Sequence, residues 1–80
     1  MKVPRDVDAD NLISALKRYG YIIVRQTGSH VRLSKRLHNG DKHSITIPNH
    51  KPIKIGTLKS IASQVCIINN LDINDFYLGL

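Results

Sequence analysis

Apolar residues recur at helical spacing in the first quarter of the chain. One face of the predicted helix carries five of them: Ala9, Leu12, Ile13, Leu16 and Tyr19. Asp8 or Asp10 is available to cap the start of this helix, since a short acidic side chain can accept hydrogen bonds from the first free backbone N–H groups. Gly20 follows the last apolar position and predicts the end of the helix.

The pattern then changes to the period of β-strands. Tyr21–Arg25 is rich in β-branched and aromatic residues, and Thr27–Ser29 has the composition of a tight turn. The following strand alternates strictly, with Val31 and Leu33 facing the core and His30, Arg32 and Ser34 on the opposite face. Asn39–Asp41 supplies a hairpin turn, and a third strand, His43–Ile47, ends at Pro48. We expect an antiparallel meander.

Helical spacing returns in the last third of the chain. Thr57 is a suitable cap for a second helix, whose apolar face is Leu58, Ile61, Ala62 and Val65. A short helix over residues 72–78, capped by Asp72 or Asn74, would pack Phe76 on the body of the protein. The order helix, three strands, helix predicts one α+β domain over residues 1–80, with helices on one face of a three-stranded antiparallel sheet.

Composition and charge narrow the functional classes. The 80 residues suffice for one core, and the lone Cys66 among apolar neighbours predicts a buried thiol in a reducing compartment, the cytoplasm. We expect no signal peptide and no membrane span. The formal net charge of the chain is +6. Residues 17–59 carry ten Lys or Arg and one acid and contribute +9, whereas residues 1–16 contribute −1 and residues 60–80 contribute −2. Such a field attracts a polyanion, although a solvated basic face is the alternative.

His30 is the candidate catalytic residue. An imidazole titrates near neutrality and can take the proton of a ribose 2′-hydroxyl, while Arg32 and the nearby Arg25 would stabilise an anionic phosphorane. This combination suits RNA cleavage. A single histidine on the polar face of a strand is, by itself, more often an ordinary surface residue.

Other chemistries fit the residues less well. His38, His43 and His50 have no helical i, i+4 pairing and no supporting cysteines, so we expect no metal site. Ser29 beside His30 resembles a nucleophile and its base, but neighbours in an extended strand point to opposite faces. No phosphate loop or dinucleotide fingerprint is present in the sequence, and no cofactor is expected.

Several further residues are expected to bind the RNA backbone. Lys51, Lys54 and Lys59 surround the start of the second helix, whose first peptide groups can receive a phosphate. The alternative for these three is a simple solvated connection. The complete expected RNA-binding set is Arg25, Ser29, Arg32, Lys35, Lys51, Lys54 and Lys59. Tyr19, on the apolar face of the first helix, is assigned to the core and not to base stacking.

Three segments together resemble the HicA family of toxins. They are Arg25–His30, Ile45–His50 and Gly56–Leu58, and the resemblance extends from about Leu12 to about Val65. It implies a double-stranded-RNA-binding-domain-like α-β-β-β-α fold, metal-independent mRNA cleavage that depends on the histidine after Gly-Ser, here His30, and neutralisation by a HicB-type antitoxin. The role of the tail after Cys66 stays open.

The sequence is therefore compatible with two main functional classes. The first is an endoribonuclease toxin with His30 as base, and the second is a non-catalytic RNA-binding module, because folds of this type recognise A-form RNA by shape without cutting it. A third class, a basic protein that serves only an acidic partner, would bind that partner and not RNA. Replacement of His30 separates the first class from the second.

Overall fold

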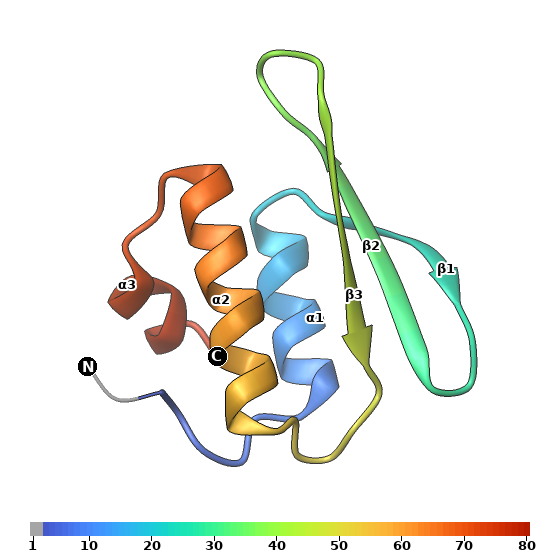
Figure 1. Ribbon diagram of the computed structural model, residues 1–80, viewed down its shortest axis with the longest axis vertical. Helices are drawn as coiled ribbons and strands as arrows, with labels where there is room; N and C mark the ends of the chain where they lie inside the picture. Colours follow the sequence, from blue (N-terminus) through green and yellow to red (C-terminus); the bar gives the residue numbers. More distant parts are fainter. Residues whose placement is uncertain (1–2) are drawn as a thin grey trace.

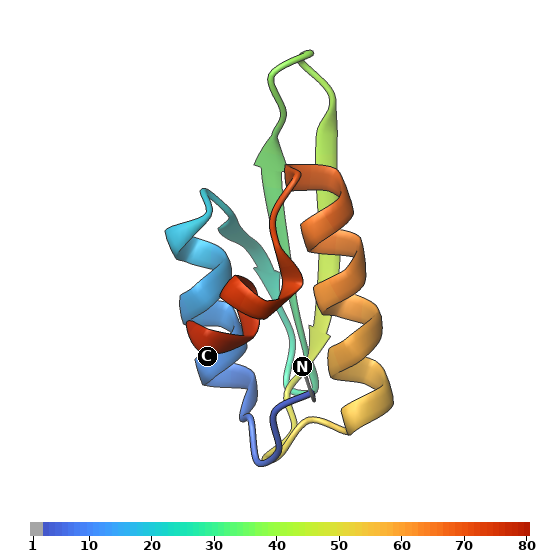
Figure 2. The same cartoon turned by 90° about the vertical axis from the view of Figure 1, so that its left-hand side faces the viewer.

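The computed structural model describes residues 3–80. Its elements follow the order α1 (Ala9–Arg18), β1 (Ile22–Gln26), β2 (His30–Arg36), β3 (Lys42–Pro48), α2 (Ile55–Asn69) and α3 (Ile73–Leu78). The three strands form one antiparallel sheet in the order β1-β2-β3, and α1 and α2 cover one of its faces (Figure 1). The short α3 lies against the helices on the side away from the sheet (Figure 2). The predicted α+β architecture, with its double-stranded-RNA-binding-domain-like order, is confirmed.

The central strand β2 follows the predicted alternation. Val31 and Leu33 are buried, while His30 and Arg32 are exposed. Ser34 differs from the expectation of a solvated polar face, because it is buried and its hydroxyl bonds to Ser44 Oγ at 2.7 Å. The reason is its place in the middle strand, where its register partners on both sides cover a small side chain.

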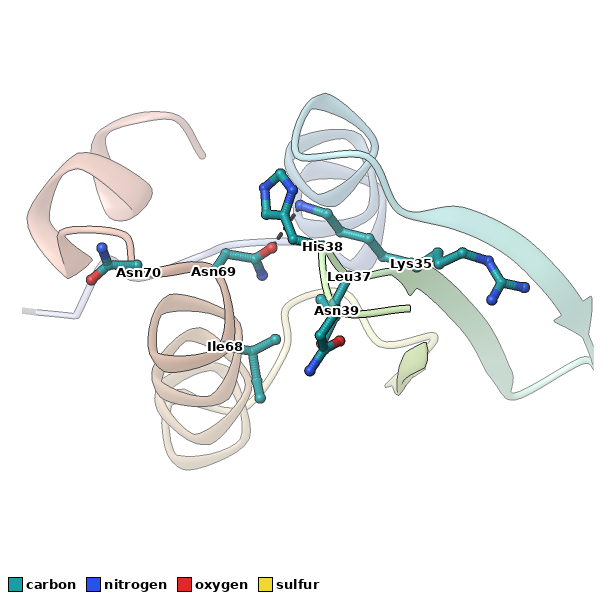
Figure 3. A pocket seen from close by; sticks show the side chains of 8 residues that line it. Lys35, Leu37, His38, Asn39, Ile68, Asn69 and Asn70 are labelled. Atoms are coloured by element: carbon teal, nitrogen blue, oxygen red, sulfur yellow. Dashed lines mark hydrogen bonds between the residues drawn. The ribbon is translucent and has the colours of Figure 1, made fainter. Parts of the chain in front are cut away.

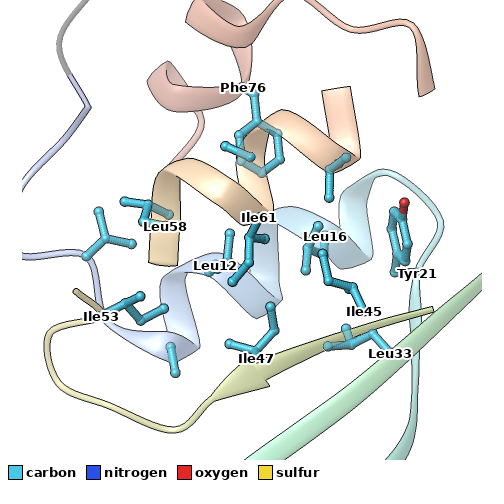
Figure 4. Close-up of a cluster of buried hydrophobic side chains, with 14 of the residues drawn as sticks. Leu12, Leu16, Tyr21, Leu33, Ile45, Ile47, Ile53, Leu58, Ile61 and Phe76 are labelled. Atoms are coloured by element: carbon cyan, nitrogen blue, oxygen red, sulfur yellow. The ribbon is translucent and has the colours of Figure 1, made fainter. Parts of the chain in front are cut away.

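The core lies between the sheet and the two long helices. Leu12 and Leu16 of α1, together with Leu33 and Ile47 of the sheet, are completely buried and point toward one another in Figure 4. The apolar face predicted for α2 is also confirmed as buried: Leu58, Ile61, Ala62 and Val65. Burial of each large aliphatic side chain contributes about 1.5–3 kcal/mol, so this layer is the main source of stability.

The N-cap residue of α1 is one of the two that the sequence predicted, whereas the N-cap residue of α2 is not the predicted one. Asp8 is the N-cap of α1, and its backbone N–H donates to Asn11 Oδ1 at 3.0 Å. The N-cap of α2 is Lys54, so the prediction of Thr57 as cap is wrong. The physical reason is that the buried Ile53 fixes the preceding chain, and the Lys54 carbonyl then accepts the N–H of Leu58 at 2.9 Å, which closes the first turn early.

The short C-terminal helix is confirmed and completes the hydrophobic packing. The Asp72 side chain caps α3 by accepting the backbone N–H of Asn74 at 2.7 Å. Phe76 is fully buried and stacks on Tyr19 of α1, with 5.7 Å between ring centroids. Cys66 is buried as predicted, and burial raises the pKa of its thiol. No helix within residues 3–80 is long and apolar enough to cross a membrane.

Candidate functional site

The turn between β1 and β2 is held by hydrogen bonds on both sides of Gly28. The backbone N–H of Thr27 donates to the His30 carbonyl at 2.9 Å, and the N–H of His30 donates to Thr27 Oγ1 at 3.2 Å. A threonine that bonds to neighbouring backbone groups stabilises a tight turn. The backbone of His30 is therefore fixed at the first position of β2.

Ser29 ties this turn to the end of β3 and to the imidazole. Its carbonyl accepts the backbone N–H of Asn49 at 2.9 Å, and its hydroxyl lies 3.0 Å from His30 Nδ1. The expectation that the side chains of Ser29 and His30 point to opposite faces is wrong. The alternation rule applies within a strand, whereas Ser29 precedes the strand and belongs to the turn.

His30 presents its ring on the outer face of the sheet. It is exposed, and alternation along β2 places it on the same face as Arg32, opposite the buried Val31 and Leu33. Within residues 3–80 no hydrogen bond engages Nε2, so this nitrogen is free to meet a ligand. The position satisfies the first requirement of a general base, which is access to the proton that it removes.

A β-bulge in β1 brings Arg25 to the same face. Ile23 pairs with Leu33 and Arg25 pairs with Arg32, so the register shifts between these pairs, at Val24. In an unbroken register Val24 would pair with Arg32, and Arg25 would face the core beside Val31. The inserted residue instead rotates the Arg25 side chain outward, which is the re-aiming effect of bulges near functional sites.

The two arginines form a cationic pair on the outer face. Arg25 and Arg32 are exposed register partners on neighbouring strands, and directly opposite residues share one face of a sheet. Thr46 of β3 continues this row on the other side of Arg32. Like charges placed opposite each other are destabilising, so this pairing favours the binding of an anion on the outer face.

Three predicted lysines lie at the same end of the molecule as the turn. Lys51 follows β3, Lys54 is the N-cap of α2, and Lys59 lies in the early turns of that helix. All three are exposed, and the loop that carries Lys51 begins at Asn49, which is bonded to Ser29. The β1–β2 turn and the β3–α2 loop appear together at the lower end of Figure 1.

Lys35 is not part of this group. It lies near the other end of β2, and its register partner is His43. Its amino group donates to Asn69 Oδ1 at 2.6 Å and lies 5.7 Å from the centroid of the Tyr21 ring. Figure 3 shows the hydrogen bond between Lys35 and Asn69 in a pocket between the β2–β3 hairpin and the end of α2. The pocket is lined by Lys35, Arg36, Leu37, His38, Asn39, Ile68, Asn69 and Asn70.

A polar network beneath Lys35 joins three elements of the fold. The Tyr21 hydroxyl lies 2.7 Å from His43 Nδ1 and accepts a hydrogen bond from Asn69 Nδ2 at 2.9 Å. Burial raises the pKa of Tyr21 and lowers the pKa of His43. Both shifts favour the neutral forms of the two side chains, and the Tyr21 hydroxyl links His43 of β3 to Asn69 of α2.

The remaining histidines do not gather around a metal position. Within residues 3–80, no three His, Cys, Asp or Glu side chains lie close enough together to hold a metal ion. His38 is exposed in the hairpin, His43 is bonded to Tyr21, and His50 is exposed in the loop after β3.

Comparison with known families identifies the family of the chain. The family described as the HicA toxin of bacterial toxin-antitoxin matches residues 9–67. The chain belongs to the HicA family. Membership makes the protein the toxin of a toxin-antitoxin system and implies an antitoxin partner. Among curated proteins and solved structures, none matches the chain.

The HicA match extends from the start of α1 into the second half of α2, and α3 lies outside it. Two contributors to the site were not predicted: Val24, which forms the bulge, and Asn49, which anchors Ser29. Thr27 was predicted as part of the turn, but not as the residue that fixes the His30 backbone. A threonine three residues before His30 was a visible turn signal. Nothing in the sequence marked the bulge.

Proposed function

We propose that this HicA-family toxin is an endoribonuclease that cleaves mRNA with His30 as the general base. The observation that carries the proposal is the exposed imidazole of His30, fixed in a bonded turn on the same face as the paired Arg25 and Arg32. A base beside two cations with no acid opposite them fits a phosphodiester better than a neutral substrate.

The chemistry follows from this arrangement. Nε2 of His30 takes the proton of a ribose 2′-hydroxyl, and the 2′-oxygen forms a bond to the adjacent phosphorus. The bond from phosphorus to the 5′-oxygen breaks, and the departing oxygen takes a proton from water. Arg25 and Arg32 stabilise the negative charge that develops on the phosphoryl oxygens. The internal nucleophile removes the need for a metal-activated water, so we propose a metal-independent reaction.

The lysines at the same end supply the backbone contacts. Lys51, Lys54 and Lys59 border the start of α2, where no acidic residue occupies the first turn. A helix N-terminus with neighbouring cations favours phosphate. We propose that these residues hold RNA beside the site and that a HicB-type antitoxin neutralises the toxin in the cytoplasm.

The test compares His30→Ala with His38→Ala on a defined mRNA. His38 is an exposed hairpin residue at the far end of β2, so its replacement is a matched control. We expect loss of cleavage for His30→Ala only, with RNA binding retained and with stability within about 0.5 kcal/mol of wild type because the side chain is exposed. Tight RNA binding without cleavage by the wild-type protein would instead indicate a non-catalytic RNA-binding module.

A further inference from the structure

The contact between Ser29 and His30 has a consequence for the proton on the imidazole. A neutral histidine carries its proton on one ring nitrogen, and the hydrogen bond made by the other nitrogen decides which. Ser29 Oγ lies 3.0 Å from Nδ1. If Nδ1 carries the proton and Nδ1–H donates a hydrogen bond to Ser29 Oγ, Nε2 keeps its lone pair and is a base.

We propose that Ser29 is a positioning residue that holds His30 in the Nδ1–H tautomer when RNA is bound. The inference rests on the proposed function and deepens it. Ser29 touches the base and acts on the reaction through it. Its hydroxyl oxygen accepts a hydrogen bond from Nδ1–H, and its own O–H is then free to donate a hydrogen bond to a phosphate oxygen.

The fixed geometry of the turn supports this role. The Ser29 backbone is held through its carbonyl by the N–H of Asn49, and the His30 backbone is held by Thr27. Both partners of the contact are thus anchored before substrate arrives. A preorganised hydrogen bond needs no further ordering at the moment of reaction, and such a second contact is a usual means of orienting a histidine.

The cationic face determines the direction of the hydrogen bond. Arg25 and Arg32 attract a phosphate to the side of the sheet on which His30 lies. An anion near the turn accepts a hydrogen bond from the Ser29 O–H, which leaves the Ser29 oxygen as acceptor for Nδ1–H. The same bond persists after Nε2 has taken the 2′-hydroxyl proton, because the imidazolium carries protons on both nitrogens.

The decisive measurement is ¹⁵N NMR of the His30 ring. It uses full-length wild type, Ser29→Ala and Ser29→Thr, each with an oligoribonucleotide that is 2′-O-methylated throughout and cannot be cut. We expect the Nδ1–H tautomer in wild type and in Ser29→Thr, and a shift toward Nε2–H in Ser29→Ala, since Nδ1–H loses its acceptor. An Nε2–H ring in the wild-type complex, or an unchanged tautomer in Ser29→Ala, would overturn the proposal.

Cleavage rates give a second readout on unmodified RNA. Loss of one net hydrogen bond predicts a fall in kcat of about two- to tenfold for Ser29→Ala, with KM changing less and with recovery in Ser29→Thr. Ser63→Ala on α2 is the matched control and should cleave as wild type. Equal rates for Ser29→Ala and wild type would contradict the positioning role. Cleavage that survives His30→Ala would refute the proposed function alone, because the tautomer measurement does not depend on activity.

Discussion

Arg25 lies directly opposite Arg32 on the outer face of the sheet because Val24 is inserted as a bulge between the two strand pairings. The bulge places two like charges side by side, an arrangement that weakens a sheet unless an anion joins it. In this chain the two arginines lie opposite each other next to His30. A local departure from regular pairing is thus the feature that links the scaffold to the proposed phosphate site.

The arginine pair predicts opposite effects on stability and on RNA binding. Arg32→Gln should leave the free energy of unfolding unchanged or raise it by up to about 0.5 kcal/mol at low salt, because repulsion is relieved. RNA affinity should fall, and the slope of log K against log salt should shrink by roughly 0.7–0.9 for the lost phosphate contact. Urea unfolding and fluorescence anisotropy titrations measure the two effects.

Lys42→Gln is the matched control for this prediction. Lys42 is the register partner of Arg36, so its replacement also removes one cation from a pair on neighbouring strands. This pair lies at the end of β2 that is distant from His30. It should resemble Arg32→Gln in stability and wild type in RNA affinity. Equal losses of RNA affinity in both variants would show that only total charge matters.

Lys35 and Lys54 should separate stability from RNA binding. Lys35→Ala removes the hydrogen bond to Asn69 and should lower the free energy of unfolding by about 1–2 kcal/mol, with little change in RNA affinity. Lys54→Ala should weaken RNA binding while stability stays within about 0.5 kcal/mol of wild type. Urea unfolding and fluorescence anisotropy titrations measure these changes in stability and RNA affinity. A large RNA defect in Lys35→Ala would place a second contact surface at the hairpin.

Acid should weaken the network around Tyr21. Burial lowers the pKa of His43, so the folded protein disfavours the imidazolium. The contribution of neutral His43 to the free energy of unfolding is fully present above about pH 6.5, the pKa of histidine in the unfolded chain. It is lost as the pH falls through the lower pKa that His43 has in the folded protein. Urea unfolding at about pH 7.5 and about pH 5 should show this loss in wild type and a smaller one in His43→Gln.

His38→Gln provides the control for the pH series, because His38 is exposed in the hairpin. Its unfolding should keep the pH dependence of wild type. If His43→Gln and His38→Gln lose the same amount of stability between the two pH values, the network is not the source of the acid sensitivity.

Most of the fold could be predicted because strong periodic signals agree with tertiary packing. The alternation predicted for Val31 and Leu33 is confirmed by their burial, and three of the five residues of the apolar face predicted for α1 are buried, while the other two are partly buried against the core. The start of α2 was misplaced because the position of Ile53, buried by distant parts of the chain, decides where the helix begins. Good capping chemistry at Thr57 could not reveal that tertiary constraint.

The sequence predicted most of the residues that form the site, but not how their side chains are placed. The turn residues and alternation singled out His30 and Arg32, but the outward direction of Arg25 depends on a bulge that no residue type announces. The bond between Ser29 and His30 arises in a turn, where the strand rule does not hold. Lys35 shares the charge of the other lysines, yet its place near the far end of β2 takes it to Asn69.

End-group analysis of RNA cut in the presence of a chelator tests the proposed cleavage reaction most directly. Removal of the 2′-hydroxyl proton by His30 makes the ribose oxygen the nucleophile. The proposed reaction should give fragments with a 2′,3′-cyclic phosphate or its hydrolysis product and a free 5′-hydroxyl. It should not cut at a 2′-deoxyribose placed at the scissile position, and His30→Ala should give no products. A requirement for added magnesium, or 5′-phosphate ends, would contradict the proposed reaction and indicate attack by metal-activated water.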